Sequence, residues 1–225
     1  MTRINNTKVQ FYLGRNLTRS INYFRNSWKS NGVCLSLQGP YKTKQNLYTD
    51  ACKHAYGPSV KVRLPLFNGL SFSIRVKLRD HSVNYLTNQL IKLFNMSTMN
   101  FQKFANWEYK TASYIRELYQ KNGVSNYTFG NAQKLINLAI KYILSYQCTP
   151  YQHDVFKYGF FPIDRIIQTK LKKQFGVGYL YKSSTIPSWA KCDNWFEILD
   201  YQKRARNEIM KNNFYSPILW EVTNW

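Results

Sequence analysis

The stretch from Gly130 to Ile143 carries the residues whose types and spacing best suit chemistry. Lys134 and Lys141 lie on one face of a predicted helix, opposite an apolar stripe. The stripe consists of Ala132, Leu135, Ile136, Ala139 and Ile143. Asn131 suits an N-cap, which places Lys134 in the first turn, where the helix dipole favours an uncharged amine over an ammonium. Such an amine is a nucleophile; alternatively, Lys134 is an exposed side chain or a phosphate contact.

Asp164 is the second candidate for a chemical role. Pro162 suits the first position of a later helix, so Asp164 is expected in the first turn. A carboxylate there either takes part in chemistry or only stabilises the helix end, by about 0.3–1 kcal/mol. The apolar residues before it predict that Asp164 is partly buried.

The two segments together resemble the helix-hairpin-helix DNA glycosylase superfamily, in particular its 8-oxoguanine branch. That branch has a hairpin of pattern G-x-G-x-K, which Gly130-x-Ala132-x-Lys134 matches except at Ala132, and a later V-P-V-D or V-D segment similar to Phe161-Pro162-Ile163-Asp164. The resemblance implies that Lys134 is a Schiff-base lysine and Asp164 the catalytic aspartate. It also implies that a modified or damaged base is flipped out of DNA for excision.

The charge of the chain points to the same class of partner. Among its 225 residues, 32 Lys and Arg stand against 11 Asp and Glu, for a net charge of +21. Residues 1–107 carry sixteen of the basic residues and only two acidic ones. This surplus predicts a polyanionic partner, with double-stranded DNA first. Two alternatives to an enzyme remain: a non-enzymatic nucleic-acid-binding protein, and an interaction or inhibitor module for an anionic protein surface.

A β-hairpin is predicted on either side of the turn Phe67-Asn68-Gly69. Residues 60–66 and 70–79 alternate between apolar and polar types, and a three-residue loop with Gly69 in a left-handed conformation brings the apolar residues to one face. The other face is basic, and it is either simply solvated or binds phosphates. The predicted nucleic-acid-binding residues are Lys61, Arg63, Arg75 and Lys77 of the hairpin, with Gly130, Lys141 and Arg165.

Helical spacing takes over from about Ser82, and further helices are expected over residues 101–119, 131–146, 162–175 and 193–211. The predicted fold is therefore α+β. A basic N-terminal part with the β-hairpin spans residues 1–81, and a helical, glycosylase-like domain with a helix-hairpin-helix-like element spans residues 82–225.

Other classes of protein lack their signatures. No apolar stretch approaches a membrane span, and the first residues form no secretory signal, so we expect a cytoplasmic protein with no membrane partner. The four cysteines form no C-x-x-C pair, which predicts reduced thiols and no metal site. No phosphate-binding G-x4-G-K-[ST] loop is present, so we expect no cofactor.

Overall fold

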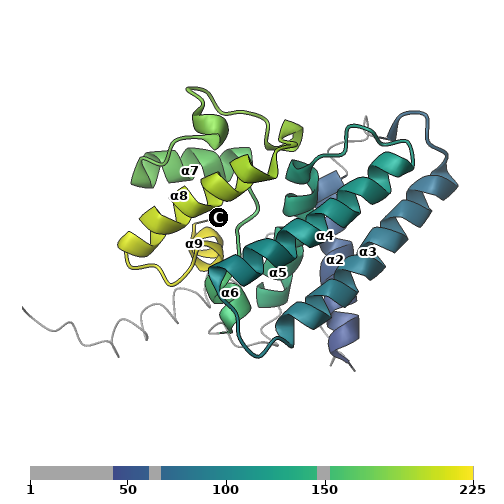
Figure 1. Ribbon diagram of the computed structural model, residues 1–225, viewed down its shortest axis with the longest axis horizontal. Coiled ribbons are helices and arrows are strands. Elements are labelled where there is room, and N and C mark those ends of the chain that lie inside the picture. Colours follow the sequence, from purple (N-terminus) through teal and green to yellow (C-terminus); the bar gives the residue numbers. More distant parts are fainter. Residues whose placement is uncertain (1–42, 61–66, 146–152, 225) are drawn as a thin grey trace, which may run out of the picture.

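The computed structural model describes residues 43–60, 67–145 and 153–224, and within these ranges the chain forms helices and turns but no strand. The α-helices, labelled as in Figure 1, are α2 (Lys44–Val60), α3 (Phe72–Phe94), α4 (Phe101–Lys121), α5 (Phe129–Ser145), α6 (Asp154–Tyr158), α7 (Arg165–Phe175), α8 (Trp195–Lys211) and α9 (Pro217–Thr223). Two short 3₁₀ turns, η2 (Leu180–Lys182) and η3 (Trp189–Lys191), lie between α7 and α8.

Helix α5 is the centre of the bundle. Fifteen of its seventeen residues are buried, because α2 and α4 pack against it. Helices α3 and α4 form a hairpin and lie side by side (Figure 1). Helices α7, α8 and α9 gather at the other end of the molecule (Figure 1). One hydrophobic core runs from Leu47 in α2 to Val222 in α9.

The α+β prediction is wrong for the described residues. Residues 70–79, expected as a strand, include the first turns of α3, and the boundary expected between residues 81 and 82 falls inside this helix. The other arm, residues 61–66 with Lys61 and Arg63, lies outside the described residues. The predicted turn is present, since the Leu70 N–H donates to the Phe67 carbonyl at 3.0 Å and Gly69 has φ +85°.

The alternating pattern at the start of α3 led to a wrong prediction of a strand, because its apolar residues do not share a buried face. Phe72 is 77% exposed and Ile74 39% exposed, whereas Leu78 is buried. Ser71 caps the helix by accepting a hydrogen bond from the Ile74 N–H at 3.4 Å. From Leu78 onward the buried residues follow helical spacing, so the first turns extend a helix that packs further along.

The helices expected over residues 101–119, 131–146, 162–175 and 193–211 are confirmed, with ends shifted by a few residues, as α4, α5, α7 and α8. Helices α2, α6 and α9 were not expected. In α2 the signal was weak because Gly57 and Pro58 stand in its last turn. Among the described helices, none has the length and apolar character that crossing a membrane requires.

Candidate nucleic-acid interface

Lys134 and Asp164 meet between α5 and α7. The Lys134 Nζ lies 3.7 Å from Asp164 Oδ2, and each side chain is only 15% exposed. Asp164 is the N-cap of α7, where its Oδ1 accepts a hydrogen bond from the Ile167 N–H at 2.9 Å. The Lys134 ammonium also lies 4.4 Å from the centre of the Trp189 ring. An amine, a carboxylate and an aromatic ring thus lie close together at a partly buried site between α5 and α7.

A buried polar network holds α5 against the segment before Asp164. The Gln133 side chain accepts a hydrogen bond from the Ile163 N–H at 3.2 Å and donates to the Ile163 carbonyl at 3.3 Å. Asn137 donates to Gln133 at 3.3 Å and to the carboxyl of Glu108, on α4, at 2.8 Å. Burial raises the pKa of Glu108 to about 8, although the hydrogen bond from Asn137 opposes the shift. The network fixes the backbone next to Asp164.

The positions of Lys134 and Asp164 within their helices differ from the expected positions by a few residues. Helix α5 begins at Phe129 and Asn131 is buried inside it, so Lys134 lies in the second turn, away from the dipole that was expected to act on it. Asp164 is the N-cap itself, one residue before the helix. The interpretation of Asp164 as a helix-stabilising cap is confirmed, and the ion pair with Lys134 adds to it.

Two residues predicted to contact nucleic acid are buried in the protein. Lys141 is 1% exposed and its Nζ donates to the Glu221 carboxylate, in α9, at 2.6 Å, so its ammonium is occupied inside the protein and does not reach the surface where a phosphate was expected. Gly130 does allow a close approach, but of the Trp189 carbonyl, with which any Cβ added at Gly130 would overlap. The protein itself therefore fills the space that the prediction assigned to a phosphate.

The other predicted contacts lie on two different helices. Arg75 is half-buried and Lys77 exposed in the first part of α3, and Arg165 is exposed at the first position of α7. Of these residues, Arg165 is the one next to Asp164.

A run of basic residues without any acidic residue begins at Arg165, directly after Asp164. Residues 165–192, called here the basic segment, contain six Lys and Arg and no Asp or Glu. These are Arg165, Lys170, Lys172, Lys173, Lys182 and Lys191, all of them exposed except the half-buried Lys170. Arg165, Lys172 and Lys173 share one face of α7, since they stand seven and eight residues apart.

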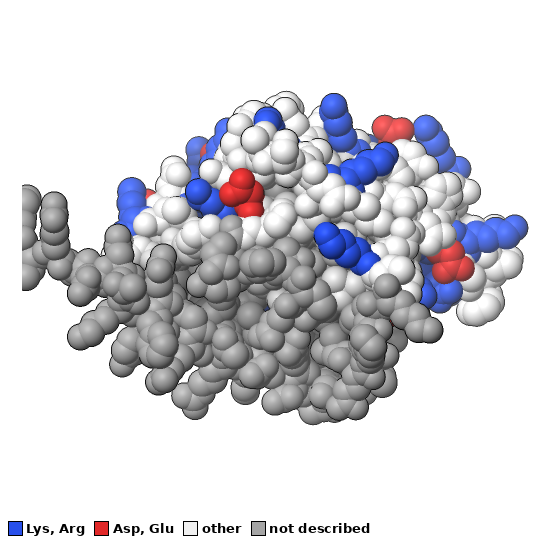
Figure 2. All heavy atoms as spheres, turned by 90° about the horizontal axis from the view of Figure 1, so that it is seen from below, with Lys and Arg blue, Asp and Glu red and all other residues white. Residues whose placement is uncertain are grey.

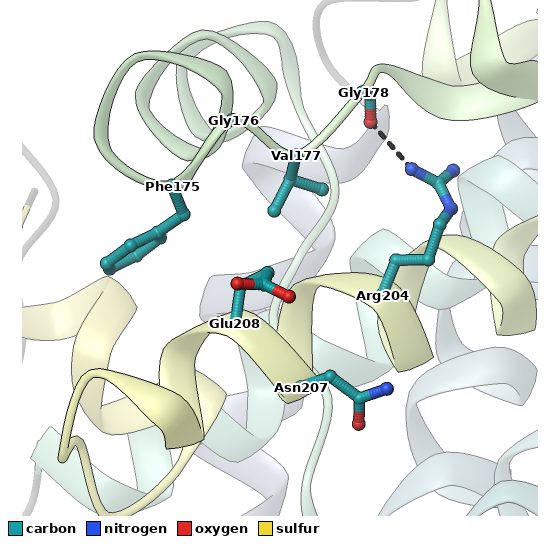
Figure 3. Close-up of a pocket in the computed structure, with 7 residues that line it drawn as sticks. All are labelled: Phe175, Gly176, Val177, Gly178, Arg204, Asn207 and Glu208. Atoms are coloured by element: carbon teal, nitrogen blue, oxygen red, sulfur yellow. Dashed lines mark hydrogen bonds between the residues drawn. The ribbon is translucent and has the colours of Figure 1, made fainter.

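Hydrogen bonds from Arg204 hold the loop after α7, at Gly178 and Tyr179, against α8. Gly176, with φ +68°, ends α7 in a left-handed C-cap. The Arg204 guanidinium donates to the Gly178 carbonyl at 2.9 Å (Figure 3) and to the Tyr179 carbonyl at 3.2 Å, while its Nε donates to Asp200 at 2.8 Å. A groove of about 450 Å³ lies beside this attachment. Its lining residues are Phe175, Gly176, Val177, Gly178, Arg204, Asn207 and Glu208 (Figure 3).

Sequence analysis missed the lysines of the basic segment because charge was summed over halves of the chain. Residues 108–225 hold nine of the eleven acidic residues, so the surplus of Lys and Arg over Asp and Glu is small there. That sum does not show that residues 165–192 contain no acidic residue. The usable signal was the spacing between Asp164 and Asp193, the two acidic residues that flank the run.

No group of three or more His, Cys, Asp or Glu side chains suited to a metal ion occurs among the described residues. Comparison with family models, curated proteins and solved structures finds no match for this chain.

Proposed function

We propose that the protein binds nucleic acid through the basic segment. The observation that carries this proposal is the run of residues 165–192, in which five of the six Lys and Arg are exposed and no acidic residue stands between them. Phosphates are held by such side chains, and neutralising each one releases counterions from the nucleic acid. The exposed aromatic ring of Tyr181 in the same segment offers a surface for a base.

The rest of the surface supports the same proposal. Among the described residues, seven ion pairs occupy seven of the eleven acidic residues, and an eighth, Glu108, is fully buried. Few carboxylates are left to offset the other Lys and Arg. On the face shown in Figure 2, Lys and Arg outnumber Asp and Glu across the described surface.

The test is the salt dependence of binding to a labelled oligonucleotide, measured by fluorescence anisotropy. We expect affinity to fall steeply with salt, and the variant Lys172→Gln/Lys173→Gln to flatten the slope of log K against log salt by about 1.8 for a duplex. The control is Lys92→Gln/Lys110→Gln, which removes two exposed lysines from α3 and α4. An equal effect of both pairs would contradict binding through the basic segment. Binding without salt dependence, or no binding, would contradict a nucleic-acid partner.

A second candidate function, base excision with lyase chemistry, is favoured by one observation: Lys134, Asp164 and Trp189 converge. In this reaction the uncharged Lys134 amine forms a bond to the sugar C1′ as the bond from C1′ to the base breaks and the base leaves with a proton. Asp164 stabilises the positive charge that develops on the sugar. The ion pair of Lys134 with Asp164 has to open first, because an ammonium has no lone pair with which to attack.

Borohydride trapping on duplexes with damaged bases or abasic sites tests this second function. We expect a covalent adduct with the wild type and with Lys110→Ala, an exposed lysine of α4, but none with Lys134→Ala. Asp164→Asn is expected to slow base release. Absence of both adduct and base release on every substrate would refute the enzyme while leaving nucleic-acid binding intact.

A further inference from the structure

Tyr181 is displayed at the surface by a strained turn of the basic segment. It is 41% exposed, and it has φ +59° while the next residue, Lys182, has φ +49°. The left-handed region is unfavourable for residues that carry a side chain, and here two consecutive residues occupy it. Such a turn persists only where its surroundings hold it in place.

Contacts on both sides hold this turn. Leu180 is fully buried, and its N–H donates to the Gln168 side chain, on α7, at 3.1 Å. The Lys182 N–H donates to the Tyr179 carbonyl at 3.0 Å. The Tyr181 hydroxyl lies near the Cys192 thiol. The backbone that displays the exposed ring is therefore held on both sides.

The ring of Tyr181 also differs from its neighbours in being uncovered. The Lys172 ammonium lies 4.4 Å from the centre of the Tyr179 ring. The Lys134 ammonium lies 4.4 Å from the centre of the Trp189 ring. Within the described part of the chain, no aromatic ring and no cation is stacked on Tyr181. An exposed ring on which no described ring or cation is stacked is a platform for another flat group.

We propose that Tyr181 stacks on an unpaired base and that Lys182 and Lys191 hold the phosphates on either side of it, so that the preferred ligand is single-stranded nucleic acid. Both lysines are exposed, and Lys191 precedes Cys192, the residue that Tyr181 contacts. Base pairs inside a duplex are covered by their neighbours, so an exposed ring reaches a base face only where the base is unpaired. This inference rests on the proposed function and names the substrate class for the same segment.

The experiment compares three fluorescein-labelled ligands of about 20 nucleotides at one salt concentration: oligo(dT), an abasic strand of equal length and charge, and a duplex. We expect oligo(dT) to bind about five- to a hundredfold more tightly than the abasic strand, the range expected for stacking on one ring. Tyr181→Gly is expected to abolish this difference and leave affinity for the abasic strand unchanged. Glycine accepts positive φ without strain, so the turn is retained.

Two further variants separate the ring from its surroundings. Tyr181→Phe keeps the ring and is expected to keep the preference for oligo(dT). Phe72→Ala removes an exposed ring from the start of α3 and is expected to change nothing. Circular dichroism melting confirms that each variant is folded.

Equal affinity of the wild type for oligo(dT) and the abasic strand would overturn the stacking proposal but leave the proposed function standing. The same holds if Tyr181→Gly keeps the preference, or if the duplex binds more tightly than oligo(dT). Failure to bind any of the three ligands would overturn the proposed function as well.

Discussion

Glu108 makes the stability of the protein depend on pH in a direction opposite to that of most carboxylates. The side chain is fully buried between α4 and α5, where one carboxyl oxygen accepts the hydrogen bond from Asn137 and the other has no partner among the described residues. Burial raises the pKa of Glu108 from its ordinary value of 4.5 to about 8. The folded protein therefore holds a proton there that the unfolded chain releases above about pH 4.5.

The sign and size of the effect follow from proton linkage. Because the folded state binds more protons than the unfolded state between the two pKa values, stability falls as the pH rises through this window. The loss is about 1.4 kcal/mol for each pH unit, on the order of 5 kcal/mol in total. Glu108→Gln mimics the protonated side chain, since its amide oxygen still accepts from Asn137, and it carries no charge at any pH.

The assay is urea unfolding followed by circular dichroism at about pH 5.5, 7 and 9. We expect Glu108→Gln to be more stable than the wild type by about 1.4 kcal/mol at the lowest pH and by on the order of 5 kcal/mol at the highest. The control Glu117→Gln removes an exposed carboxylate of the same helix and is expected to show no such trend. An effect of Glu108→Gln that stays constant across this range would refute the reasoning, because it would mean that Glu108 is ionised in the folded protein.

Two further predictions concern buried contacts. Gly130→Ala places a methyl group against the Trp189 carbonyl and is expected to lower the free energy of unfolding by about 1–3 kcal/mol. The control Gly57→Ala, which has open space at its Cβ, is expected to be neutral or stabilising. Urea unfolding measures both variants, and equal effects would contradict the close approach of Trp189 to Gly130. Glu221→Ala removes the carboxylate that the buried Lys141 ammonium contacts at 2.6 Å and is expected to cost about 3–5 kcal/mol. Lys141→Met combined with Glu221→Leu is expected to recover most of that loss, and a double variant no more stable than Glu221→Ala would refute this account of the pair.

Local sequence patterns were sufficient to predict an element wherever residues close together in the chain determine its structure. The apolar spacing of α4, α5, α7 and α8, the turn at Gly69 and the capping interpretation of Asp164 all depend on residues within one or two turns of one another. The same patterns failed at the start of α3. An alternating sequence forms a strand only if a second strand and a core face lie beside it, and neither is encoded in those residues.

The surplus of Lys and Arg is a property of the amino-acid sequence alone, and the sequence also predicted four of the described helices, α4, α5, α7 and α8. Tertiary structure decided which charged residues meet solvent: Lys134 and Asp164, thirty residues apart, come together, and Lys141 pairs with Glu221, eighty residues away. Both lysines lie on the face of α5 that its own sequence marks as polar. A lysine on that face is exposed or buried according to whether a distant segment covers it and supplies a carboxylate, because a buried ammonium is tolerated only with such a partner.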